Sequence, residues 1–222
     1  MAALKSRGKR KSNEFGNFRD IEQTLRWEPV DWQHHQFSRR GIIFLHYEID
    51  NDESYEFSHD LIYLTKIEPP MEAGKIKPIW IILDSPGGDA SAGFAIYDMI
   101  MAAVNAGIEV NIVGKGAVAS MAAAIIQAGS RRFVLPHTQF LVHEVSQTVI
   151  ELAEKVSEGR ERIEENERIN RIYMSIIAER AGMDVNELIK LSKKTDCWFD
   201  AKSALKLGSH GLADEIITSL PF

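Results

Sequence analysis

One serine stands out as a residue that could do chemistry. Ser120 lies in VGKGAVASMAAAIIQAGS (Val113–Ser130), a run of mostly small and apolar residues suited to burial, and none of its close neighbours has a polar side chain. A buried hydroxyl needs a hydrogen-bond partner or it costs stability. Ser120 is therefore either a helix N-cap, the usual role of a lone serine at a helix start, or a nucleophile activated by residues distant in the sequence.

A serine nucleophile needs a base, and the base needs an acceptor that holds it in one tautomer. His143, in the apolar run QFLVHEV, is the candidate base, although such a histidine taken alone is more typical of a core or strand-edge residue. Asp196, in KKTDCWFDAKSAL, is the candidate acceptor, because its rival Asp200 already has a role as N-cap of a helix that begins at Ala201. Together these residues indicate acyl transfer by a Ser–His–Asp triad.

Main-chain donors for such a reaction could come from two places. The SPGG run, Ser85–Gly88, follows an apolar stretch, and its glycines allow N–H groups to point together at one oxygen atom. Two glycines alone favour an ordinary strand-to-helix turn. If a helix begins at about Ser120, the N–H of Met121 has no intrahelical partner and can act as an oxyanion donor.

The chain around these residues alternates between predicted strands and helices. Short apolar stretches predict strands at Gly41–Tyr47, Ile79–Leu83, Glu109–Val113, Arg131–Pro136 and Gln139–Val145. Helical spacing and cap residues predict helices over Tyr55–Glu68, after SPGG to Val104, from about Ser120, over Val149–Ala181, after the cap Asp184, and after the cap Asp200 to near Gly208. Strand–helix–strand units of this kind predict an α/β fold with parallel strands.

Composition narrows the class of protein. The 222 residues suit one domain with appendages, and the formal net charge of −6 argues against a general nucleic-acid binder. Cys197 is the only cysteine, so no intrachain disulfide forms, and no apolar stretch is long enough to span a membrane. The N-terminus lacks a secretory signal, so we expect a cytoplasmic protein. Residues 1–40 are expected to be a polar, partly flexible or partner-binding arm that precedes a domain at residues 41–222.

Several spaced motifs, in order, resemble the proteolytic subunit of the Clp protease (ClpP) over about residues 40–218. They are IIFL near Ile42, SPGG with AGFAIYDMI (Ser85–Ile100), GAVASMAAAIIQAG (Gly116–Gly129), RRFVLPHTQFLVHE (Arg131–Glu144) and DCWFDAKSALKLG with GLADEI (Asp196–Ile216). The resemblance implies a ClpP/crotonase-like α/β core of repeated β-β-α units, with a long handle helix in about residues 145–181. By matching position it implies Ser120 as nucleophile, His143 as base and Asp196 as orienting acid, with an oxyanion hole at Gly88 and Met121.

The resemblance also implies how such a subunit works. Family members cleave unfolded polypeptides inside a chamber made of seven-membered rings, without a cofactor or a metal. An AAA+ unfoldase docks on the ring and spends the ATP, and this sequence accordingly contains no P-loop motif. We therefore expect polypeptide substrates, a heptameric ring or double ring and an unfoldase partner, with no nucleic acid and no membrane.

Other functions remain open on the sequence. After His143 the family usually has a glycine pair in its substrate-binding strand, whereas Glu144–Gln147 contains no glycine, which affects cleavage preference and ring packing. Relatives with a Ser–Lys dyad have a membrane anchor that this sequence lacks, and acyl-CoA hydratases on a similar core lack the serine nucleophile. A ring subunit that is catalytically silent and acts as a scaffold or regulator is the remaining alternative.

Overall fold

The computed structural model describes residues 36–145, 156–193 and 195–222, and Phe37–Phe222 belong to one compact unit. Nearly all of the proposed N-terminal arm, residues 1–40, lies outside the described residues. The predicted start of the long handle helix, in residues 146–155, lies outside them as well.

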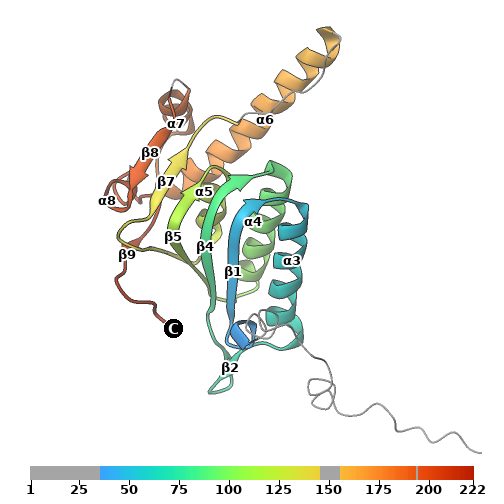
Figure 1. Ribbon diagram of the computed structural model, residues 1–222, viewed down its shortest axis with the longest axis vertical. Coiled ribbons are helices and arrows are strands. Elements are labelled where there is room, and N and C mark those ends of the chain that lie inside the picture. Colours follow the sequence, from blue (N-terminus) through green and yellow to red (C-terminus); the bar gives the residue numbers. More distant parts are fainter. Residues whose placement is uncertain (1–35, 146–155, 194) are drawn as a thin grey trace, which may run out of the picture. The chain divides into compact units, whose positions relative to one another are not determined.

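A mostly parallel sheet forms the centre of this unit (Figure 1). Its main path runs β1–β4–β5–β6–β9, and β7 and β8 extend it beside β5, with β7–β8 as the antiparallel pair. The strands are β1 (Ile42–Ile49), β4 (Ile79–Gly88), β5 (Val110–Ala119), β6 (Arg131–Val134), β7 (Gln139–Val142), β8 (Cys197–Asp200) and β9 (Glu215–Ile216). A separate hairpin joins β2 (Met71–Glu72) to β3 (Lys75–Ile76).

Helices cover one face of the sheet, and α3 and α4 lie side by side there (Figure 1). The helices are α3 (Asn51–Ile62, continued by a π-helical turn at Tyr63–Ile67), α4 (Ala90–Asn105), α5 (Met121–Ile125, followed by a 3₁₀ turn at Ile126–Ala128), α6 (Val156–Ala181), α7 (Val185–Ser192) and α8 (Ala201–Ala204). The large apolar core lies between helices and sheet, and it includes Leu45, Ile81, Ile112 and Phe140. A smaller cluster around Ile82 and Val113 packs separately from it, as expected for alternate strand residues that point to opposite faces.

The predicted α/β fold is therefore confirmed, and so are the caps. The Asp184 carboxylate accepts from the N–H groups of Asn186 and Glu187, and the Asp200 carboxylate accepts from Ser203 N–H. The observed bounds of two strands differ from the predicted ones. Strand β4 continues through SPGG to Gly88, where we expected a turn, and a strand, β8, directly follows Asp196 where we expected a break between helices. None of the helices in the described ranges combines the length and apolar composition needed to cross a membrane.

Strand β5 changes partner halfway along its length. Residues Asn111–Gly114 pair with β6, whereas Ala117–Ala119 pair with β7. The register of β5 against β4 shifts between Leu83 and Ser85, at the same level of the sheet. Because of this switch, the ends of β5 and β7 lie side by side, and these two ends carry Ser120 and His143.

Candidate active site

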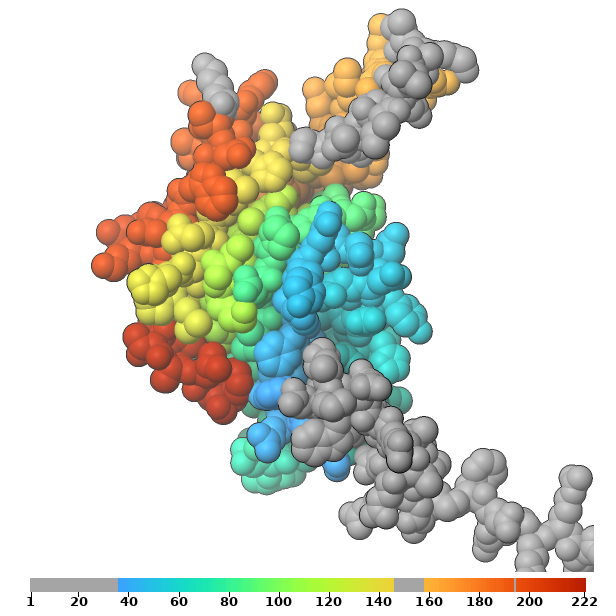
Figure 2. Space-filling view, in the orientation of Figure 1, coloured from blue at the N-terminus to red at the C-terminus, as the bar shows by residue number. Residues whose placement is uncertain are grey.

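The predicted site residues meet at one end of the sheet. Ser120 follows the last residue of β5, His143 follows the last residue of β7, and SPGG ends β4. Asp196 precedes the first residue of β8, which runs antiparallel to β7 and so begins where β7 ends. Carboxyl ends of parallel strands are where ligands bind in α/β sheets. Figure 2 shows that the yellow segment of β7 lies between the green of β5 and the orange of β8 on this face.

Ser120 forms a sharp turn between β5 and α5. Its φ is 52° and its ψ is −124°, a positive φ that is uncommon for a residue with a side chain and costs about 1–3 kcal/mol. The Ser120 N–H donates to Leu141 O at 2.8 Å, which ties the turn to β7. The residue occupies the N-cap position, yet its hydroxyl makes no capping hydrogen bond. The helix-cap interpretation therefore does not explain this half-buried hydroxyl.

The glycines of SPGG permit a close approach to that turn. Gly87 has φ +95°, and a methyl group on it would lie 2.6 Å from Ser120 Cβ and 2.9 Å from the Met121 nitrogen. Gly88 has φ +154° and faces the other neighbour, since a methyl group there would lie 2.2 Å from Ile49 O. Gly87 is thus the glycine that packs directly against the Ser120 turn, and Gly88 packs against β1.

Two polar side chains of β4, Asp84 and Ser85, form hydrogen bonds where the register of β4 with β5 and with β1 shifts. Asp84 Oδ1 accepts from Ala117 N–H at 3.0 Å, and its Oδ2 pairs with Lys115 Nζ at 2.5 Å, where the β4–β5 register shifts. The buried Ser85 hydroxyl donates to Tyr47 O at 2.5 Å and accepts from Gly87 N–H at 3.1 Å, where the β1–β4 register shifts. Main-chain groups that lose their ladder partners at these bulges are thereby satisfied.

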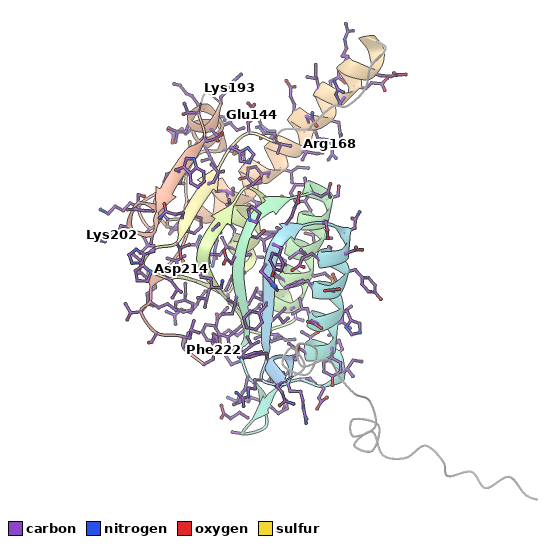
Figure 3. All side chains as sticks on the ribbon, in the orientation of Figure 1. Glu144, Arg168, Lys193, Lys202, Asp214 and Phe222 are labelled. Carbon is purple, nitrogen blue, oxygen red and sulfur yellow. The ribbon has the colours of Figure 1, made fainter. Side chains whose placement is uncertain are left out.

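His143 is half-buried at the end of β7, one residue beyond the register partner of Cys197. Its Nδ1 lies 2.8 Å from the carbonyl oxygen of Glu144. A carbonyl oxygen can only accept, so the neutral ring donates from Nδ1, and Nε2 is left with a free lone pair. This is the tautomer that a general base requires. Figure 3 labels Glu144 at this end of β7, close to α6.

Asp196 is exposed and directly precedes β8, whose first residue, Cys197, pairs with Val142, the residue before His143. In residues 36–145, 156–193 and 195–222, no hydrogen bond or ion pair joins the side chains of Ser120, His143 and Asp196. The topology therefore brings the three segments together, while the His143 ring is bonded to a carbonyl in the place where a triad has its carboxylate. Burial, and then the nearby Asp196 charge, raise the pKa of Cys197, so this thiol is not a competing nucleophile at neutral pH.

The sequence interpretation missed two residues of α6 that reach this site. The Tyr173 hydroxyl donates to Ser120 O at 3.2 Å, and the His143 main chain lies close enough to lower the pKa of this hydroxyl. Asn170 Oδ1 accepts from Val145 N–H at 3.0 Å. Both side chains are buried. The sequence signal that could have found them is a pair of polar residues three positions apart in a predicted helix, because such residues lie on the same helix face.

Comparison with known proteins agrees with this architecture. The Clp protease family model matches residues 28–220. ATP-dependent Clp protease proteolytic subunit 2 of Treponema denticola is 34% identical over 176 residues, 78% of this chain and 81% of the relative. The subunit of the same name from Thermobifida fusca is 29% identical over 82% of this chain and 83% of the relative. The ATP-dependent Clp protease proteolytic subunit of Porphyromonas gingivalis is 32% identical over 79% and 73% of the two chains. The chain therefore belongs to the Clp protease family.

Proposed function

We propose that this protein is a serine endopeptidase, the proteolytic subunit of an ATP-dependent Clp-type protease. The observation that carries the proposal is the Ser120 turn. It combines a positive φ and a hydroxyl without a capping bond with a main-chain bond to β7, the strand that His143 directly follows. Strained backbone that the surrounding structure maintains is concentrated at functional sites. A sharp strand-to-helix turn is also where the nucleophilic serine of α/β-hydrolase enzymes lies.

The proposed reaction is acyl transfer. Ser120 Oγ attacks a peptide carbonyl carbon while His143 Nε2 takes the hydroxyl proton, and the carbonyl oxygen becomes an oxyanion. We assign the N–H groups of Gly88 and Met121 as its donors. Collapse of the tetrahedral intermediate breaks the C–N bond, and His143 protonates the leaving amine. Water then attacks the acyl-enzyme with the same groups in reversed roles.

Asp196 is assigned as the acid that orients His143 in the active arrangement. In this arrangement the His143 ring turns from Glu144 O toward the Asp196 carboxylate; the support is that the neighbouring residues, Val142 and Cys197, pair across β7 and β8. A carboxylate at Nδ1 keeps the same tautomer as the carbonyl and also stabilises the imidazolium that forms during the reaction. The carbonyl can do only the first of these.

The assembly and partner proposals rest on the family. The relatives' names describe ATP-dependent proteases, and we propose that this chain forms a heptameric ring or double ring. An AAA+ unfoldase supplies unfolded polypeptide to that ring, in the cytoplasm. The acidic composition fits this assignment better than it fits nucleic-acid binding.

One observation favours a second candidate, a catalytically silent ring subunit. In the described part of the chain the three triad side chains are not bonded to one another, and the His143 ring is bonded to the main chain instead. A scaffold subunit would retain the fold and these residue types without using them.

A fluorophosphonate probe separates the two functions, because it reacts only with an activated serine. We expect one adduct, on Ser120 by peptide mapping, and hydrolysis of fluorogenic peptides by the same sample. Ser120→Ala is expected to abolish both while leaving the native mass of the assembly unchanged. Ser209→Ala, whose hydroxyl donates to Gly182 O in an exposed loop, is the matched control and should keep both activities. An assembled ring without an adduct would establish the silent subunit instead.

A further inference from the structure

The hydroxyl of Tyr173 joins the two main-chain segments that carry the proposed nucleophile and base. It donates to Ser120 O at 3.2 Å, and the His143 main-chain N–H lies close enough to lower its pKa. Tyr173 belongs to α6 and is only 2% exposed, so water does not compete for this hydrogen bond. The Ser120 turn and the end of β7 thus both lie beside one oxygen atom from a third element.

The tyrosine stays protonated under all working conditions. Burial raises its pKa well above the ordinary value of 10.0, and the His143 N–H offsets only part of that effect. A neutral phenol can donate one hydrogen bond and accept another. The Ser120 carbonyl oxygen uses the donor, and the acceptor is available to the nearby His143 N–H.

Asn170 adds a second attachment on the same side of α6. Its Oδ1 accepts from Val145 N–H at 3.0 Å, two residues beyond His143. Residues three positions apart lie on one helix face, so Tyr173 and Asn170 hold successive points of the same extended segment. The position of His143 along its strand is therefore set from α6 as well as from the sheet.

We propose that Tyr173 is a positioning residue for the reaction: its hydroxyl sets the placement of His143 relative to Ser120. This inference rests on the proposed function. Misplacement of catalytic groups by about 1 Å can cost about 100-fold in rate. Without the hydroxyl, Ser120 O loses its hydrogen-bond donor and the His143 N–H loses a polar neighbour, so the two segments are free to separate.

The test is Tyr173→Phe, which removes one oxygen atom and keeps the ring that fills the core. We expect kcat for a fluorogenic peptide, counted per Ser120 that the fluorophosphonate can titrate, to fall about tenfold with KM changed less than twofold. The rate constant for labelling Ser120 should fall by a similar factor. Counting active sites removes any effect of a smaller folded fraction, which a purely structural role would produce. Tyr97→Phe, at a half-buried hydroxyl on α4, is the matched control and should change neither constant.

A second variant tests the same arrangement independently. Asn170→Ala frees Val145 N–H and leaves Tyr173 intact, and we expect about a threefold fall in the labelling rate constant. Rate constants for Tyr173→Phe within twofold of wild type would overturn the positioning role while leaving the proposed protease in place. A loss of thermal stability with unchanged rate constants per active site would overturn it as well. A wild-type protein that takes no label at Ser120 would overturn the proposed function, and the positioning role with it.

Discussion

The two halves of the proposed site are built in different ways. The nucleophile half, made of the ends of β4 and β5 and the start of α5, is held by main-chain contacts and by Gly87, which packs against Ser120 with no space for a side chain. The base half, made of the ends of β7 and β8, presents an exposed Asp196 and a half-buried His143 whose ring is bonded to a neighbouring carbonyl.

This difference indicates where activity can be controlled. A turn fixed by backbone sterics has few alternative arrangements, because moving Ser120 would break the packing of Gly87 and the bond to Leu141. A histidine that exchanges a carbonyl for a carboxylate needs only a side-chain rotation and a small strand adjustment. We therefore expect the nucleophile half to be preformed and the base half to be completed when the site becomes active.

The largest effect is expected for Asp196→Asn. Loss of the carboxylate removes the charge that stabilises the imidazolium and presents an amide to Nδ1, and the corresponding change in a related triad costs about 10⁴-fold in kcat. We expect a loss of 10³-fold or more in peptide hydrolysis. The melting temperature should change by less than about 2 °C because Asp196 is exposed and makes no side-chain hydrogen bond or ion pair to the described residues. A loss below tenfold would mean that Glu144 O suffices to orient the ring and that both halves are preformed.

An intermediate effect is expected for Gly87→Ala. Its methyl group would lie 2.6 Å from Ser120 Cβ and 2.9 Å from the Met121 nitrogen, so the nucleophile turn must shift. We expect about a 100-fold fall in the labelling rate constant of Ser120. Gly107→Ala is the matched control: its φ of +85° is close to the +95° of Gly87, but no atom lies within 4 Å of the added methyl group. Equal effects of the two substitutions would show that backbone strain, and not contact with Ser120, is responsible.

The smallest effect is expected for Asp84→Asn, at the bulge behind the nucleophile turn. Partial burial by itself raises the Asp84 pKa, but the Lys115 ammonium and the Ala117 N–H together lower it below the ordinary value of 3.8. The carboxylate therefore stabilises the fold above that value, and this contribution is lost as the pH falls through the lowered pKa. The asparagine oxygen can still accept from Ala117 but cannot pair with Lys115.

The measurement for this variant is thermal unfolding at several pH values. We expect Asp84→Asn to melt about 2 °C below wild type at pH 7, because the ion pair is partly exposed to solvent. The difference should shrink at pH values below 3.8. A difference that stays constant down to pH 2 would show that the charge of Asp84 does not stabilise the nucleophile half.

Much of the fold could be predicted from local patterns. The apolar strand Ile79–Leu83 and the capped helices after Asp184 and Asp200 depend on residue type and spacing within a few positions. Strand β8 was missed because its four residues, CWFD, show no clear alternation and gain their partner only from β7, more than fifty residues earlier. The extension of β4 through SPGG was missed because prolines and glycines ordinarily end a strand, and here Ser85 and Asp84 supply the missing hydrogen-bond partners.

The identities of Ser120, His143 and Asp196 could be selected from sequence because each residue type has a chemical property that its surroundings do not explain. Their meeting at one end of the sheet was decided only by the tertiary structure, through the switch of β5 from β6 to β7 and the antiparallel return of β8. The contacts of Tyr173 were likewise decided only by the tertiary structure. A tyrosine in an amphipathic helix is ordinary until the chain is folded, since only then do a distant carbonyl and a distant N–H reach the same hydroxyl. Residue chemistry is local, whereas hydrogen-bond partners across a core depend on how whole elements pack.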